Sequence, residues 1–209
     1  MTRLELTQKY WKYYLLLEKK FLESIEYVEL HVDNSGAFSN GYALIMQAVG
    51  AELDTIFKEF CGYRTSDRKS INDYAQYILS HNQDIVNIKI NLQEYDIEIQ
   101  PFKNWSVNQP GQTLTWWIAF TSLKHNRFDC IKEANQLNVL NILGALYLME
   151  MMLLKKITEN SEELDVFDAS SNLFTLKNWS SKAIPMGEAF VVLGDLIAGK
   201  NCDNRNFDA

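Results

Sequence analysis

Prolines, glycines and cysteines are scarce in this sequence of 209 residues. Three prolines and nine glycines are too few for a disordered or linker-rich chain. The three cysteines, Cys61, Cys130 and Cys202, lie far apart, are odd in number and form no CxxC pair, which favours reduced thiols over a disulfide framework or a zinc site. We therefore expect a single globular domain over residues 1–209, with no structural metal and no cofactor.

Several functional motifs are also absent. The sequence has no glycine-rich phosphate loop, no HExxH and no GxSxG, which argues against phosphate-cradling loops, zinc proteases and hydrolases with a nucleophile elbow. Its first residues lack the basic and apolar regions of a secretory signal, so we expect a cytoplasmic location. The net charge of −7 opposes general binding to a phosphate backbone, so a local basic pocket is the electrostatic route to a nucleic acid.

Apolar residues recur at the three- and four-residue spacing of helices over much of the chain. This pattern predicts helices at about 8–32, 40–60, 71–79, 113–123 and 129–156. The last helix is apolar almost all round, but Asn141 and Glu150 interrupt it before the ~20 apolar residues of a membrane span are reached. We expect this helix to be buried at the centre of a bundle, and we expect no membrane partner.

An alternating pattern between about 85 and 101 predicts an inserted β-hairpin. Val86, Ile88 and Ile90 alternate with polar residues, as do the apolar positions just before Pro101, with a turn at 92–94. The C-terminal extension, about 161–209, is mixed: 173–176 is strand-like, and the apolar stretch 189–196 fits a strand or a helix. The predicted fold is therefore mainly α, an antiparallel helical bundle with an inserted hairpin and a small mixed C-terminal element.

A polar patch stands where the helix at 113–123 meets the long helix. It comprises Lys124, His125, Asn126 and Arg127. A histidine there can act as general base towards a ribose 2′-hydroxyl, while Lys124 or Arg127 stabilises the negative charge that develops on the phosphorus centre. This is metal-free RNA cleavage chemistry. The alternative is that the polar residues solvate a helix junction and that His125 bonds a nearby carbonyl.

Two further residues are candidate members of this site. Glu52, at the edge of the apolar stripe of the second helix, can reach Lys124, His125 or Arg127 in a bundle and orient the patch; the alternative is an ordinary carboxylate at the boundary of an amphipathic face. Trp116 offers a surface on which a base can stack. The alternative for Trp116 is a place in the core.

Three short segments resemble the HEPN superfamily (higher eukaryotes and prokaryotes nucleotide-binding). They are Thr115-Trp-Trp-Ile-Ala-Phe120, Lys124-His-Asn-Arg127, and Ala134-Asn-Gln-Leu-Asn138 at the start of a long apolar helix. The resemblance implies an antiparallel helical bundle, a homodimer and, in many members, metal-independent ribonuclease activity in toxin, phage-resistance or RNA-processing systems. The family signature places an arginine four to six residues before the histidine. Here Arg127 follows His125 instead.

Two hypotheses for function follow. The first is an RNA-associated defence or toxin-type protein, a metal-independent endoribonuclease with His125 as base and Arg127 or Lys124 assisting. The second is a non-catalytic helical module that binds a nucleotide, another anionic ligand or a partner protein. Exposure of His125 in a cleft beside a cation favours the first hypothesis, and a basic pocket with a bound ligand favours binding.

Overall fold

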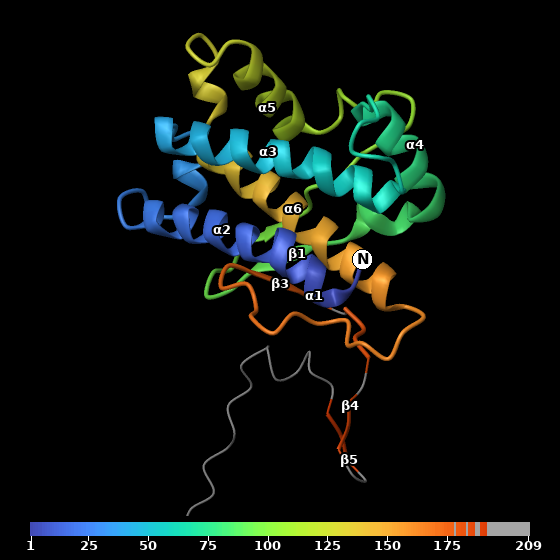
Figure 1. Ribbon diagram of the computed structural model, residues 1–209. Helices are drawn as coiled ribbons and strands as arrows, with labels where there is room; N and C mark the ends of the chain where they lie inside the picture. The colour runs from blue at the N-terminus through green and yellow to red at the C-terminus, as the bar shows by residue number, and fades with distance from the viewer. Residues whose placement is uncertain (178, 183, 187–188, 192–209) are drawn as a thin grey trace, which may run out of the picture.

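A computed structural model describes residues 1–177, 179–182, 184–186 and 189–191. The described chain is mainly helical and carries a small antiparallel sheet (Figure 1). Its N-terminal helical region is divided into three parts: α1 (Arg3–Leu6), the π-helical turn η1 (Thr7–Trp11) and α2 (Lys12–Ile25). The predicted helix at 8–32 is confirmed in type, but it begins earlier and ends earlier than its apolar spacing indicated.

The next two helices begin at serine residues that cap them. After the short 3-10 turn η2 (Val32–Asn34), α3 (Asn40–Cys61) begins where Ser39 Oγ accepts the Tyr42 amide at 3.0 Å. It ends at Gly62, whose φ of 72° suits glycine. A capping box between Ser70 and Asp73 starts α4 (Ile71–His81). Both helices confirm the predicted starts, which rest on local side-chain chemistry.

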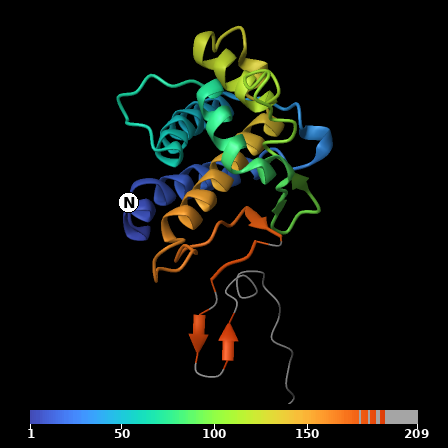
Figure 2. The ribbon, with the colours of Figure 1, turned by 90° about the vertical axis from the view of Figure 1, so that its right-hand side faces the viewer.

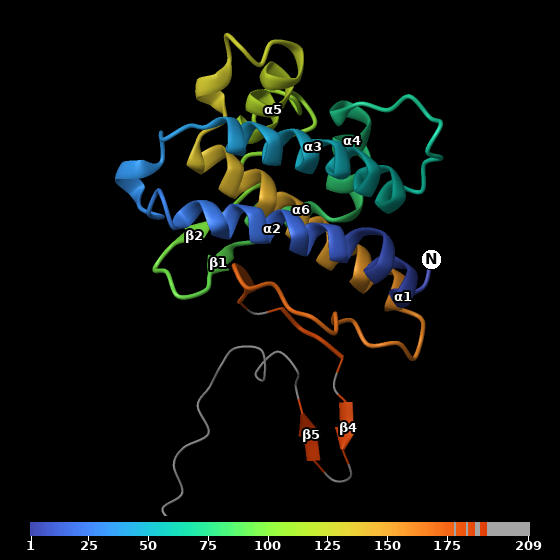
Figure 3. The ribbon, with the colours of Figure 1, turned by 60° about the vertical axis from the view of Figure 1, so that its left-hand side comes forward.

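The central element is α6 (Gln136–Thr158), which lies between α2 and α3 (Figure 3). It is long and apolar enough to cross a membrane by length and composition, but 78% of its most apolar window is buried inside the protein. The predicted central burial is confirmed. The predicted start near 129 is wrong, because residues 131–133 form the 3-10 turn η4 (Ile131–Glu133) and Asn135 caps the helix by accepting the Asn138 amide.

The helix before it, α5 (Thr115–His125), packs on both α3 and α6. Gly50 of α3 allows this close approach, because a Cβ atom there would lie 2.2 Å from the Phe120 ring. Tryptophan, phenylalanine and tyrosine side chains fill much of the core around these contacts. The bundle is thus built around α6, with α3 as its main partner.

The inserted hairpin is confirmed, but it is shorter than predicted. β1 (Ile90–Leu92) pairs antiparallel with β2 (Glu98–Ile99), with Ile90 opposite Ile99. Val86 was predicted in the first strand; it lies instead in the 3-10 turn η3 (Gln83–Asn87). Glu94, with φ of 64°, forms part of the turn.

The C-terminal extension adds a third strand to this sheet. β3 (Phe174–Leu176) pairs with β1, which gives the strand order β2-β1-β3 and confirms the predicted strand at 173–176. Between α6 and β3 the chain turns back along α6 (Figure 2). Farther on, β4 (Ile184–Met186) and β5 (Ala189–Val191) form a separate antiparallel pair. The apolar stretch predicted at 189–196 therefore begins as a strand, and 192–196 lies outside the described residues.

Candidate ligand-binding site

The predicted patch of Lys124, His125, Asn126 and Arg127 lies on the surface where α5 ends. All four residues are exposed. The His125 side chain makes no hydrogen bond within the described part of the chain, and Arg127 Nη1 donates to Asn40 Oδ1 of α3 at 2.9 Å. The structure therefore places the histidine and Lys124 together in solvent, while the arginine is held against another helix.

Two other candidate residues, Asn126 and Trp116, form hydrogen bonds within the protein. Asn126 ends α5 and its amide donates to Asp129 Oδ2 at 2.6 Å, which closes the turn after the helix. Trp116 is only 1% exposed, and its indole N–H donates to the Pro101 carbonyl at 2.7 Å. Because its ring is enclosed by the core, Trp116 offers no face on which a base can stack.

Glu52 lies on α3 and was predicted to orient the surface patch. No hydrogen bond or ion pair joins it to Lys124, His125 or Arg127 in the described residues. It is half-buried, and this burial raises the pKa of its carboxyl group. Its charge acts on the fully buried Glu150 of α6, whose pKa is raised first by burial and then by Glu52. Glu52 therefore acts electrostatically on the Glu150 carboxyl group inside the bundle.

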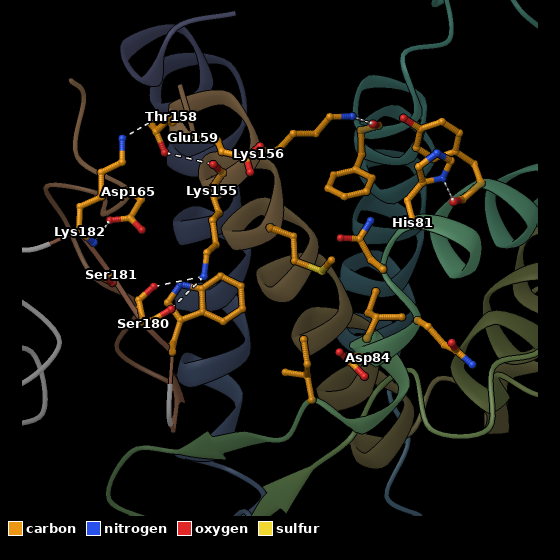
Figure 4. A pocket seen from close by; sticks show the side chains of 18 residues that line it. His81, Asp84, Lys155, Lys156, Thr158, Glu159, Asp165, Ser180, Ser181 and Lys182 are labelled. Atoms are coloured by element: carbon orange, nitrogen blue, oxygen red, sulfur yellow. Dashed lines mark hydrogen bonds between the residues drawn. The ribbon is translucent and has the colours of Figure 1, made fainter. Parts of the chain in front are cut away.

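A pocket that the sequence did not predict has a volume of about 820 Å³, within the usual range for small-molecule sites. It lies at the C-terminal ends of α4 and α6, next to η3 and residues 179–182 (Figure 4). In Figure 4, Lys155 of α6 and the labelled side chains of the C-terminal segment lie across the pocket from His81 and Asp84, whereas Lys156 extends towards the His81 side. Segments far apart in sequence therefore build the site.

Two neighbouring lysines on the last turns of α6 place ammonium groups in the wall of this pocket. Lys155 Nζ donates to the Ser180 carbonyl at 3.3 Å and hydroxyl at 3.2 Å, and lies 4.9 Å from the centre of the Trp179 ring. Lys156 Nζ donates to the Phe60 carbonyl at the end of α3. Neither lysine forms an ion pair in the described part of the chain, so no carboxylate neutralises these two ammonium groups by contact.

Aromatic side chains form another part of the pocket wall. Tyr77 and His81 of α4 stack with ring centres 4.3 Å apart. His81 Nδ1 lies 2.7 Å from the Tyr77 carbonyl; because a carbonyl only accepts, Nδ1 carries the hydrogen, and Nε2 is an acceptor in the neutral ring. The wall therefore offers a flat aromatic surface and a hydrogen-bond acceptor.

Trp179 lines the same pocket. Its indole Nε1 is buried and has no hydrogen-bond partner among the described residues. An N–H that is removed from water without an acceptor is costly, so a ligand atom or water that accepts from it is favoured. The same four residues, Lys-Asn-Trp-Ser, also occur at 103–106, where Trp105 lies in the core and its indole Nε1 is likewise buried without a hydrogen-bond partner in the described residues.

The segment that contributes Trp179 is fixed to the end of α6 by Lys182. The ammonium group of this lysine donates to the carbonyls of Thr158, Ser161 and Glu163, and its backbone N–H donates to Asp165 Oδ1 at 2.7 Å. With three N–H groups and three carbonyl partners, Lys182 is a clamp and has no donor left for a ligand.

Acidic side chains also line the pocket. They are Asp84, Glu159 and Asp165. They offer acceptors for hydroxyl or amino groups, whereas Lys155 and Lys156 offer donors, so the pocket suits a ligand with both kinds of group. Within the described residues, no group of three or more histidine, cysteine, aspartate or glutamate side chains is arranged to hold a metal ion.

The sequence carried only a weak signal for this site. The Lys155-Lys156 pair near the end of a long apolar helix was visible, but such lysines are also favoured there by the helix dipole alone. No protein-family model, curated protein or solved structure matches this chain. The HEPN resemblance therefore stays a prediction, and the case for a function depends on the residues of the pocket and the surface patch themselves.

Proposed function

We propose that this protein is a helical module that binds a nucleotide-like ligand, an anionic group joined to a flat polar ring, in the pocket between α4, α6 and residues 179–182. The observation that carries this proposal is that two ammonium groups without a carboxylate partner and a tryptophan without an acceptor for its N–H line one pocket in the described residues. Lys155 and Lys156 contact neutral oxygens and aromatic rings only, and the Trp179 indole N–H has no acceptor among the described residues.

The anionic group fits the two lysines. An ammonium group has three N–H donors, and Lys156 uses one of them on the Phe60 carbonyl. A phosphate that accepts from the remaining donors forms charge-assisted hydrogen bonds, which are stronger than neutral ones. The whole chain carries a net charge of −7 and three carboxylates also line the pocket, so the anion depends on direct contact with these two ammonium groups, which form no ion pair in the described residues.

The flat ring fits the aromatic part of the wall. A ring carbonyl or ring nitrogen accepts from the Trp179 indole, and the Tyr77–His81 stack offers a surface of matching shape. Asp84 can accept a hydrogen bond from ribose hydroxyl or amino groups on the opposite side. These features together favour a nucleotide over an inorganic anion or an uncharged nucleoside.

Calorimetric titration with AMP, adenosine and inorganic phosphate tests this function. We expect AMP to bind more tightly than either fragment, and we expect Lys155→Gln to weaken AMP binding about tenfold, which is about 1.4 kcal/mol. GMP, CMP and UMP define the base preference. Lys132→Gln is the matched control, because Lys132 is an exposed lysine of η4 and does not line the pocket. Equal binding by wild type and Lys155→Gln, or no binding of any mononucleotide, would contradict the proposal.

The exposure of His125 beside Lys124 favours a second candidate function, metal-independent RNA cleavage. An exposed imidazole with no hydrogen bond in the described structure is available to take the proton of a ribose 2′-hydroxyl. We expect wild-type protein to cleave a mixed pool of structured and single-stranded RNA in the presence of a chelator, and His125→Ala to lose this activity. His31→Ala, which alters an exposed histidine outside both candidate sites, should retain it. Loss in both variants, or in neither, would reject the assignment to His125.

A further inference from the structure

Glu150 lies near the middle of α6 and is 0% exposed, yet neither of its carboxyl oxygens has a hydrogen-bond partner in the described structure. Burial of an ionised carboxylate without a partner is among the most costly events in a protein core, and such a group takes up a proton instead. Native proteins leave few buried polar groups unpaired, so each one calls for an explanation.

The same core contains a second buried glutamate that is fully partnered. Glu18 of α2 is 1% exposed. Its carboxyl group accepts the Tyr14 hydroxyl at 2.5 Å, the Ser171 hydroxyl and the Asn172 amide at 2.9 Å. The fold therefore supplies donors to a buried carboxyl group at one place and supplies none at Glu150.

The charged group that acts on Glu150 is itself an acid, Glu52. Burial is the main cause that raises its pKa, and the charge of half-buried Glu52 on α3 adds to the effect. Tyr10, on the π-helical turn η1, feels the charges of Glu59, Glu52 and Glu150, which act with burial to raise its own pKa. No charged residue of α1, α2 or α5 shifts the pKa of Glu150, so no lysine, arginine or histidine of those helices stabilises an ionised form.

The backbone is also irregular at this place. Tyr10 belongs to the π-helical turn between α1 and α2, a feature that is rare in proteins and is frequent at functional sites. A buried unpartnered acid, a neighbouring half-buried acid and a π-helical turn therefore belong to three elements of one core, in which α6 packs on α3 and on η1 through Tyr147 and Trp11.

We propose that Glu150 is a proton-binding site in the helical core: it holds a proton in the folded protein, and release of that proton loosens α6 from α3 and η1. Glu52 is the neighbouring acid whose charge keeps the proton on Glu150. The site makes the protein responsive to pH through its core, and it does not depend on the ligand pocket proposed above.

The direction of the pH effect follows from linkage. The carboxyl group of Glu150 has its ordinary pKa of 4.5 in the unfolded chain and a higher pKa in the folded protein. The folded state therefore binds more protons than the unfolded state above about pH 4.5. The contribution of Glu150 to stability is complete below that pH and is lost as the pH rises. Its contribution to the folding constant falls tenfold for each pH unit until the folded protein also releases the proton.

Urea unfolding of the wild type and of Glu150→Gln across pH 4 to 9 measures this effect. Glutamine has the shape of the protonated acid but cannot ionise, so we expect the variant to lose the tenfold fall per pH unit that the wild type shows above its unfolded pKa. Glu23→Gln, which removes an exposed acid from α2 that acts on neither Glu150 nor Tyr10, should retain the wild-type dependence. Parallel curves for wild type and Glu150→Gln would overturn the proposal.

Infrared spectroscopy gives an independent readout of the proton. We expect the folded wild type at pH 7 to show the carbonyl band of a protonated carboxylic acid, and we expect this band to be absent from Glu150→Gln. Should that variant fail to fold, Glu52→Gln provides the test: without the Glu52 charge, the band should disappear at a lower pH than in the wild type. Absence of the band from wild type at pH 7, or a band unaffected by Glu52→Gln, would contradict the proposal.

Discussion

At the scale of the residue, Glu18 shows how one buried side chain joins two distant parts of the chain. It lies on α2, and two of its three closest donors, the Ser171 hydroxyl and the Asn172 amide, come from the C-terminal extension. The third is the Tyr14 hydroxyl of its own helix. Because the extension continues from here to residues 179–182, this contact also helps to place the wall of the ligand pocket.

Replacement of this carboxyl group should be costly. In Glu18→Gln, an amide nitrogen takes the place of one accepting oxygen, so a buried N–H or O–H loses its acceptor. We expect the free energy of unfolding to fall by about 3 kcal/mol, as measured by urea unfolding at pH 7. Glu23→Gln, an exposed change on the same helix, should change it by less than about 0.5 kcal/mol. Equal stability of the two variants would show that the Glu18 contacts contribute nothing.

At the scale of the element, local side-chain chemistry decided what the sequence could predict. Ser39 and Ser70 cap their helices, and Gly62 ends α3; serine and glycine are favoured at these positions. The start of α6 was misplaced because the apolar spacing continues through a 3-10 turn, whereas Asn135 sets the true boundary. The pairing of β1 with β3 joins residues more than 80 positions apart, and no local pattern specifies such a contact.

The contact between α3 and α5 depends on a glycine. A Cβ atom at Gly50 would lie 2.2 Å from the buried Phe120 ring, whereas at Gly41, on the same helix, the nearest atom would be 3.5 Å away. We expect Gly50→Ala to lower the melting temperature and to cost about 1–3 kcal/mol through overpacking. Gly41→Ala should be neutral or slightly stabilising, by about 0.5 kcal/mol. A Gly50→Ala protein as stable as Gly41→Ala would mean that α5 does not pack as closely as the structure shows.

At the scale of the whole molecule, α6 separates the two candidate sites. The patch around His125 precedes its first residue, and the pocket surrounds its last turns. The 23 residues of this helix span roughly 34 Å at 1.5 Å per residue. The sequence drew attention to the first site because its polar residues are contiguous, and it missed the second because helix ends and a C-terminal segment build it only after folding. A variant at one site should therefore leave the other intact.

The measurement that tests the proposed function most directly is the NMR signal of the Trp179 indole N–H during titration with AMP. The protein has five tryptophans, and the Trp179 signal is identified by its loss in Trp179→Phe. We predict that AMP shifts this signal and leaves the signal of Trp116, which is bonded to the Pro101 carbonyl, in place. We also predict that Lys155→Gln weakens the response about tenfold. Two results would contradict the assignment of this pocket as the ligand site. In the first, AMP binds but the Trp179 signal stays unchanged; in the second, AMP does not bind.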